Sequence, residues 1–201
     1  LGHSLKIDPL PIDLAEHQDY FGNHVSYFSI QQPHRIMTVT ATSEISLDGG
    51  EQPDRNEDMP WDDVRARLQE AGTDATRENR QYVLDSTHAA ASAQLADYAA
   101  ESFPPGRPLL DAVHDLMDRI HHDFTYAPGF STVSTPLAEV LSSRRGVCQD
   151  FAHLAIACLR SLGLAARYVS GYIETLPPPG KAKQPGSDES HAWFAAFLPD
   201  V

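Results

Sequence analysis

The hydrophobic period of the chain changes near its C-terminal end, and this change constrains the fold more than any other feature. From Phe151 to Leu162 the apolar residues recur at helical spacing, and Gly163 follows at a position that commonly ends a helix. Residues 166–172 then have the composition of a buried strand, and residues 191–198 form a second apolar strand. A helix followed by two strands predicts an α+β unit at this end of the chain.

Further helices are expected upstream of this unit. After Pro108, a residue tolerated in the first helical turn, apolar side chains share one face of a helix that extends to Ile120. A short helix follows with Thr135 as its N-cap. Residues 51–105 are expected to form a mostly helical connection, with an alanine-rich helix over 89–100.

The first 50 residues have strand-like patterns. Between Met37 and Leu47 the odd positions are mostly apolar and the even positions are polar, which predicts a strand with one buried face. A second strand is expected over 25–30. The predicted organisation is a partial β-rich N-terminal domain over 1–50, then the helical connection, then a core over 106–201.

Composition excludes some classes of function. The formal net charge is −13, and an acidic surface repels nucleic-acid phosphates and anionic lipid, so we expect neither as a partner. No apolar run is long enough to span a bilayer, and the first residues do not have the pattern of a signal peptide. The two cysteines, Cys148 and Cys158, would point in different directions on one helix, so we expect no disulfide. Unpaired thiols indicate a reducing compartment and predict a cytoplasmic protein.

Cys148 is the candidate nucleophile. It lies at the predicted start of the helix, two residues after Gly146, where unpaired N–H groups and the helix dipole favour a thiolate. Gly146 would let a substrate carbonyl approach the backbone, and the N–H of Cys148 would stabilise an oxyanion. The alternative is a small buried cysteine without chemistry, which is also what we expect of Cys158 on the apolar face of the helix.

His191 is the candidate base, because a cysteine nucleophile needs a histidine within hydrogen-bond reach in the fold. It begins an apolar strand directly after the Pro/Gly-rich loop at 175–188, and Trp193 shares its face of that strand. A histidine that begins a strand with no catalytic role is the alternative. The other histidines are expected on polar segments, at a helix end or against a packing neighbour: His3, His17, His24, His34, His88, His114, His121, His122 and His153.

A zinc site is a rival interpretation. Cys148, His121, His122 and His153 have the right side-chain chemistry, but none of them has a recognised ligand spacing. We therefore expect no metal and no cofactor.

Several strings of residues resemble the bacterial transglutaminase-like superfamily. They are residues 145–154 (RGVCQDFAHL), 166–172 (ARYVSGY) and 190–193 (SHAW), with 124–126 (FTY) and 135–136 (TP) as the usual lead-in. The resemblance is specific over about 106–201. In the front half, residues 19–23 (DYFGN) and 32–34 (QPH) are similar to the β-rich N-terminal domain that accompanies this core.

The resemblance implies a papain-like α+β transglutaminase core, in which a helix carrying the nucleophile Cys148 packs on an antiparallel sheet carrying the base His191. Such enzymes attack a carboxamide or peptide carbonyl, form a thioester and pass the acyl group to an amine or to water. We therefore expect a protein or peptide substrate. Members include crosslinkers, cysteine proteases and amide hydrolases, and the resemblance does not choose between them. The alternative function is a non-catalytic protein-binding module on the same fold.

The resemblance also implies a third catalytic residue, an aspartate on the strand after the histidine strand. We expect it beyond Val201, because Asp200 comes too early and lies in a turn-like context. The chain is then expected to be a fragment that lacks strands at both ends and is weakly active or inactive, since a base without its orienting carboxylate adopts the wrong tautomer. Exposed strand edges would allow a homodimer.

Overall fold

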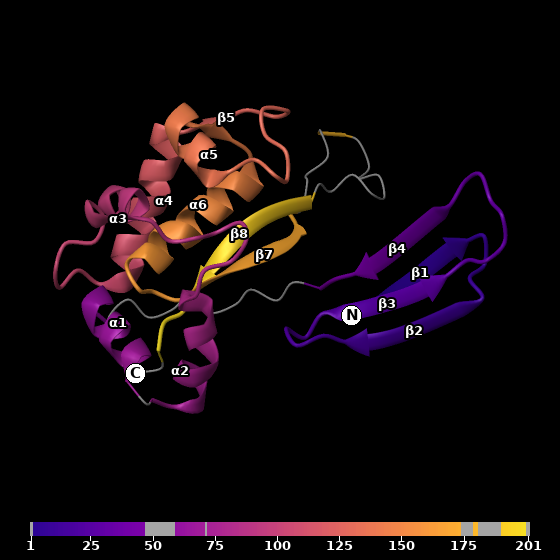
Figure 1. Cartoon of the computed structure of the whole chain (residues 1–201), viewed down its shortest axis with the longest axis horizontal. Helices are drawn as coiled ribbons and strands as arrows, with labels where there is room; N and C mark the ends of the chain where they lie inside the picture. Colours follow the sequence, from indigo (N-terminus) through magenta and orange to yellow (C-terminus); the bar gives the residue numbers. More distant parts are fainter. Residues whose placement is uncertain (1, 47–58, 71, 174–178, 181–189, 200–201) are drawn as a thin grey trace. The chain divides into compact units, whose positions relative to one another are not determined.

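Figure 1 shows the computed structural model of this α+β protein, which describes residues 2–46, 59–70, 72–173, 179–180 and 190–199. The chain divides into two compact units, Leu1–Pro53 and Asp54–Val201. In the described ranges no helix is both long and apolar enough to cross a membrane.

The first unit consists of paired strands, as its sequence pattern predicts. They are β1 (Gly2–Asp8), β2 (Asp13–Gln18), β3 (His24–Ser29) and β4 (Thr38–Glu44). Strand β1 pairs with β4 and β2 pairs with β3, both in the antiparallel sense. The strands expected at 25–30 and 37–47 are confirmed as β3 and β4 with slightly different bounds, except that residue 47 lies outside the described residues.

The prediction that one face of β4 is buried is wrong for the described residues. All seven residues of this strand are exposed, and Val39 keeps 44% of its surface accessible. In the described part of this unit, Ile7 on β1 is the one apolar side chain that is buried. Alternation makes a strand amphipathic, but burial also needs a second layer of structure, which alternation alone does not supply.

The second unit contains the helices. They are α1 (Trp61–Gln69), α2 (Asp74–Asn79), the 3₁₀ helix η2 (Arg80–Val83), α3 (Ala93–Ala100), α4 (Leu109–Asp123), α5 (Leu137–Ser143) and α6 (Cys148–Ser161). The expected alanine-rich helix begins at Ala93, because the Ser92 hydroxyl accepts a hydrogen bond from the N–H of Leu95 and caps it there. Pro136, and not Thr135, directly precedes α5.

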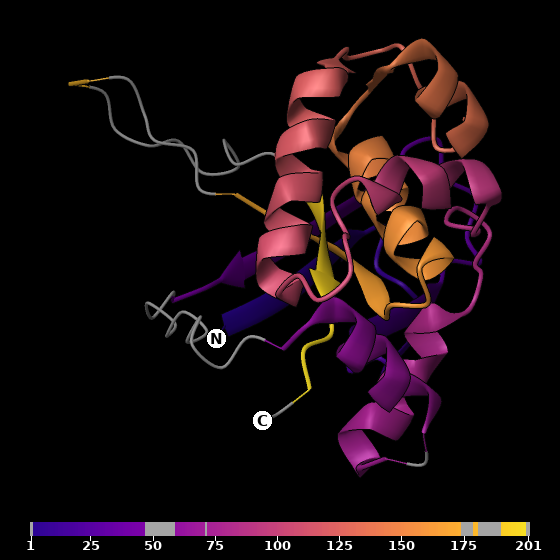
Figure 2. The same ribbon diagram turned by 90° about the vertical axis from the view of Figure 1, so that its left-hand side faces the viewer.

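Helix α6 forms the centre of the core. Its residues Leu154, Ile156 and Leu159 are at most 1% exposed. Helices α3, α4 and α5 pack against it, and Figure 2 shows α4 on one side of α6 and α3 on the other. Trp61 and Val64 of α1 belong to the same apolar cluster, so the helices before residue 106 are part of this core.

A two-stranded antiparallel sheet covers another side of α6. It consists of β7 (Ala166–Tyr172) and β8 (Ser190–Ala196), whose register pairs Tyr168 with Phe194 and Gly171 with His191. Phe194 packs against the core, and His191 and Trp193 occupy the alternate positions of β8. The helix followed by two strands is confirmed.

A short parallel pair fixes the entry to α6. Strand β5 (Thr125–Tyr126), directly after α4, pairs with β6 (Arg145–Gly146), so Gly146 lies opposite Tyr126. Between α5 and β6 the chain turns through Arg144 in the left-handed conformation, with φ of 55°. The residues immediately before α6 are therefore held by backbone hydrogen bonds to a neighbouring element.

Candidate functional site

Cys148 is the first residue of α6, and its thiol is free and partly exposed. The preceding residue, Val147, is extended and forms the N-cap. The thiol therefore lies beside the N–H groups of the first helical turn, which have no acceptor within the helix. These groups can donate to a negatively charged atom placed at the start of this 14-residue helix.

Asp150 fixes the corner at which Cys148 lies. Its side chain is 3% exposed, and its Oδ2 accepts hydrogen bonds from the N–H of Val147, at 2.8 Å, and from the Ser131 hydroxyl. A β-carbon at Gly146 would lie 2.9 Å from the β-carbon of Asp150, so only glycine permits this approach. The sequence analysis missed Asp150, although a carboxylate at the third helical position is a known capping signal.

Cys158 is the second thiol, and it is fully buried on the apolar side of α6. Burial raises the pKa of this thiol to about 12, so it stays protonated at neutral pH. The predictions of a buried Cys158 and of two unpaired thiols are confirmed.

His191 is the second residue of β8 and is half-buried. Its strand neighbour is Gly171, and the ring of Trp193 covers the space where a β-carbon on Gly171 would lie, 2.6 Å from that ring. Strand β8 packs against α6, the helix that begins at Cys148. Among the contacts of the described residues, no hydrogen bond joins Cys148 to His191, so the dyad stays a prediction.

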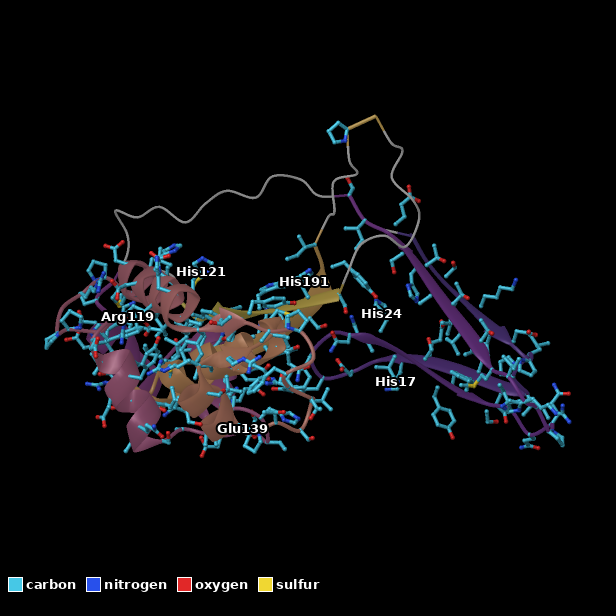
Figure 3. All side chains as sticks on the ribbon, turned by 90° about the horizontal axis from the view of Figure 1, so that it is seen from above. His17, His24, Arg119, His121, Glu139 and His191 are labelled. Atoms are coloured by element: carbon cyan, nitrogen blue, oxygen red, sulfur yellow. The ribbon has the colours of Figure 1, made fainter. Side chains whose placement is uncertain are left out.

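The residues considered for zinc do not form a cluster. His121 and His122 lie near the end of α4, and Figure 3 shows His121 there, away from His191 on β8. His153 lies on α6, where its ring stacks on the ring of His88. In the described part of the chain, no group of three or more potential ligands is arranged to hold a metal ion.

A cavity of about 450 Å³ lies alongside α6, next to the turn that carries Cys148. Four structural parts contribute to its walls: one face of α6 along most of its length, strand β7, the turn before α3 and the loop before α5. The lining residues are Ser86, Thr87, His88, Ala89, Val133, Gln149, His153, Ile156, Arg160 and Tyr168. Gln149 directly follows Cys148. Burial, and then the negative charge of a Cys148 thiolate, raise the pKa of Tyr168.

Three aromatic rings form a stack in one wall of this cavity. The imidazoles of His88 and His153 lie 5.3 Å apart and nearly parallel, and the ring of Tyr168 lies 4.9 Å from that of His153. Burial lowers the pKa of His153, and a positive charge on His88 lowers it further, so His153 is uncharged at neutral pH. His153 has packing neighbours, as expected. Its contact with His88 at the cavity was not predicted, because the two histidines are far apart in the sequence.

Arg160 lines the cavity from the last turns of α6, and its hydrogen bonds join several of the segments around it. Its guanidinium donates to the carbonyl oxygens of Tyr82, Ala89 and Ala166, at 2.9, 3.0 and 3.1 Å, and to the Ser86 hydroxyl at 2.8 Å. The sequence analysis missed this residue. The helical spacing of positions 149, 153, 156 and 160 could have indicated that Arg160 shares one face of α6 with the other cavity-lining residues.

Comparisons with known proteins give family matches for most of the chain. Residues 93–201 match the model of the transglutaminase-like superfamily, and residues 1–46 match that of the bacterial transglutaminase-like N-terminal region.

Two mycobacterial relatives are similar along nearly the whole chain. An uncharacterized protein of Mycobacterium tuberculosis (strain H37Rv) is 44% identical over 203 residues, which cover 99% of this chain and 63% of that protein. One of Mycobacterium leprae is 30% identical over 181 residues, with 89% and 61% covered. The chain thus spans less than two thirds of the length of these relatives.

A solved structure shares the fold. The crystal structure of a putative cysteine protease from Cytophaga hutchinsonii superposes with a TM-score of 0.60 at 22% identity. The match covers 98% of this chain and 61% of that one.

Proposed function

The chain belongs to the transglutaminase-like superfamily, and on this premise we propose that it carries out cysteine-dependent acyl transfer or amide hydrolysis, with Cys148 as nucleophile and His191 as base. The observation that carries the proposal is the position of the Cys148 thiol. It is partly exposed at the first residue of α6, and the next residue, Gln149, lines a cavity of about 450 Å³.

The proposed reaction has two steps. His191 takes the proton of Cys148, and the thiolate attacks the carbonyl carbon of a carboxamide or peptide bond, so that a carbon–sulfur bond forms. The backbone N–H of Cys148 donates to the oxyanion. The intermediate collapses with loss of ammonia or an amine, which takes the proton from His191. His191 then takes a proton from water or a second amine as it attacks the thioester, and the carbon–sulfur bond breaks while His191 returns that proton to the sulfur of Cys148.

Both proposed groups lie on elements that pack against each other. Strand β8 carries His191 and packs against α6, and Cys148 begins that helix. The corner before the thiol is fixed by Asp150, as transfer of an acyl group requires a nucleophile held in one position. These two observations support the dyad.

Members of this enzyme class differ in the group that accepts the acyl chain from the thioester. The Cytophaga protein is named a putative cysteine protease, and a protease would produce new peptide N-termini. A crosslinking or deamidating enzyme would instead release ammonia from a glutamine peptide, with incorporation of an added amine in the crosslinking case.

The test is a single-turnover experiment with blocked glutamine peptides, followed by intact-mass measurement of the protein. We expect a mass increase equal to the acyl group, located on Cys148 and absent in Cys148→Ser. His191→Ala should slow adduct formation by about 10²–10⁴-fold, the usual contribution of a positioned base. Equal iodoacetamide rates for wild type and His191→Ala, with no acyl adduct in either, would instead favour a non-catalytic binding module.

A further inference from the structure

We propose that the cavity alongside α6 is a subsite for a carboxylate carried by the acyl donor, with Arg160 supplying positive charge and His88 and His153 forming part of its wall. This inference rests on the proposed acyl transfer at Cys148 and names the class of substrate that this site accepts.

The charge of Arg160 has no counterion in the described structure. All four of its hydrogen bonds go to neutral acceptors, three carbonyl oxygens and one hydroxyl. Among the described residues, no carboxylate lies within ion-pair distance of the guanidinium. Asp85 acts on it only from farther away, and its carboxylate already accepts the N–H of Ala91 at 2.7 Å.

A half-buried cation without a counterion is unfavourable, and an anion bound in the cavity would supply the missing negative charge. The guanidinium has five N–H groups, and the four hydrogen bonds leave one N–H on Nη2 without a protein acceptor in the described part of the chain. Arg160 lines the cavity. A carboxylate that enters it would therefore gain both the charge and a donor.

The composition of the walls favours the same ligand. The chain has 28 acidic and 15 basic residues, yet none of the cavity's ten lining residues is acidic. Ser86, Thr87 and Gln149 add neutral hydrogen-bond donors. A lysine or arginine side chain of a substrate would find no counterion in these walls, so the subsite should reject it.

His153 strengthens the subsite when it is protonated. Burial, then His88 and Arg160, oppose a proton on His153, and Asp150 favours it. The other titratable groups around the stack are Cys148 at the start of α6 and Tyr168 on β7. A bound carboxylate adds negative charge beside the His153 imidazole, so its affinity should rise as the pH falls.

The position of Gln149 connects the proposed carboxylate subsite with the proposed reaction at Cys148. Gln149 is the residue after Cys148, so the cavity begins next to the thiol. Arg160 lies twelve residues after Cys148 on α6, about 18 Å along the helix axis, so the carboxylate would lie several residues along the peptide from the carbonyl under attack. It could come from an acidic side chain or from the free C-terminus of a short donor, since both present the same group.

The experiment measures binding without chemistry. Cys148→Ser protein is titrated by calorimetry with four glutamine peptides. Three have both ends blocked and carry Glu, Gln or Lys about five residues from the target glutamine, a spacing that matches the distance from Cys148 to Arg160 in an extended peptide, and the fourth has Gln at that position and a free C-terminal carboxylate. We expect the Glu peptide, the free-carboxylate peptide or both to bind about tenfold or more tightly than the blocked Gln peptide, and the Lys peptide to bind most weakly. The tighter of the first two identifies the source of the carboxylate.

A charge reversal in the wall supplies the control. His88 is exposed, so His88→Glu should fold, and it should remove the preference for carboxylate peptides. His114→Glu makes the same change on the exposed face of α4, outside the cavity, and should leave the preference intact. Equal binding of the carboxylate and blocked Gln peptides, or equal effects of the two substitutions, would overturn the subsite. Because no acylation is needed, this failure is distinct from failure of the proposed acyl transfer.

Discussion

The backbone N–H of Val147 donates a hydrogen bond to the carboxylate of Asp150 over 2.8 Å, so the residue before Cys148 is tied to the first turn of the helix that Cys148 begins. The Ser131 hydroxyl donates to the same oxygen atom, which connects the loop before α5 to this corner. The orientation of the thiol therefore depends on one buried carboxylate.

Removal of that carboxylate should destabilise the protein measurably. Asp150→Ala leaves the Val147 N–H without its acceptor at a partly buried position, so we expect the free energy of unfolding to fall by about 1–3 kcal/mol. Urea denaturation measures this change. Asp63→Ala is the matched control, because Asp63 is also the third residue of its helix but is exposed. A loss for Asp63→Ala as large as that for Asp150→Ala would contradict the role of the buried hydrogen bonds.

Gly146→Ala should disturb the same corner by steric overlap. The new methyl group would lie 2.9 Å from the β-carbon of Asp150 and 3.1 Å from the ring of Phe151. We expect the free energy of unfolding to fall by about 1–3 kcal/mol, as for other overpacked sites. Gly2→Ala is the control, since its methyl group would meet only Glu44, at an ordinary 3.7 Å. Equal melting temperatures for wild type and Gly146→Ala would show that Asp150 moves aside freely.

The elements around the site could be predicted from sequence where a hydrophobic period was sustained. The helical spacing from Phe151 to Leu162 and the apolar runs that follow gave α6, β7 and β8, because one face of each is buried against a common core. The same reasoning failed for β4, whose alternation is regular but whose residues are all exposed. The hydrophobic period of a strand indicates which of its faces can be buried, but it does not indicate whether another element covers that face.

The cavity could not be predicted in this way. Its walls combine His88, Val133, Arg160 and Tyr168, which come from separate elements and meet only in the folded chain. Arg160 in particular is a charged residue near the end of a helix, a position that suits any basic side chain at the surface. Its inward contacts follow from tertiary packing, which a single sequence does not show.

The two cysteines should differ sharply in reactivity. Cys158 is fully buried, and burial raises its pKa to about 12. In the native protein its thiol is therefore protonated and out of reach of a reagent in solution. At a mildly alkaline pH we expect iodoacetamide to modify Cys148 alone, and to modify both cysteines in denaturant. Peptide mass mapping distinguishes the sites, and Cys148→Ser is the control that should take up no label when native. Rapid native labelling of Cys158 would contradict its position in the core.

His153 should make the stability depend on pH in a defined direction. Its pKa in the folded protein is below the ordinary value of 6.5, mainly because the ring is buried. Between the folded and unfolded pKa values the unfolded chain binds more protons, so the stabilisation present above pH 6.5 is lost as the pH falls through the folded pKa.

The measurement is urea unfolding of wild type and His153→Gln between about pH 5 and about pH 8, the range in which histidines titrate. Glutamine does not titrate, so we expect wild type to lose more stability than His153→Gln as the pH is lowered. His114→Gln, at an exposed position on α4, should follow the wild-type dependence. Parallel curves for wild type and His153→Gln would mean that the imidazole accepts a proton in the folded protein as easily as in the unfolded chain.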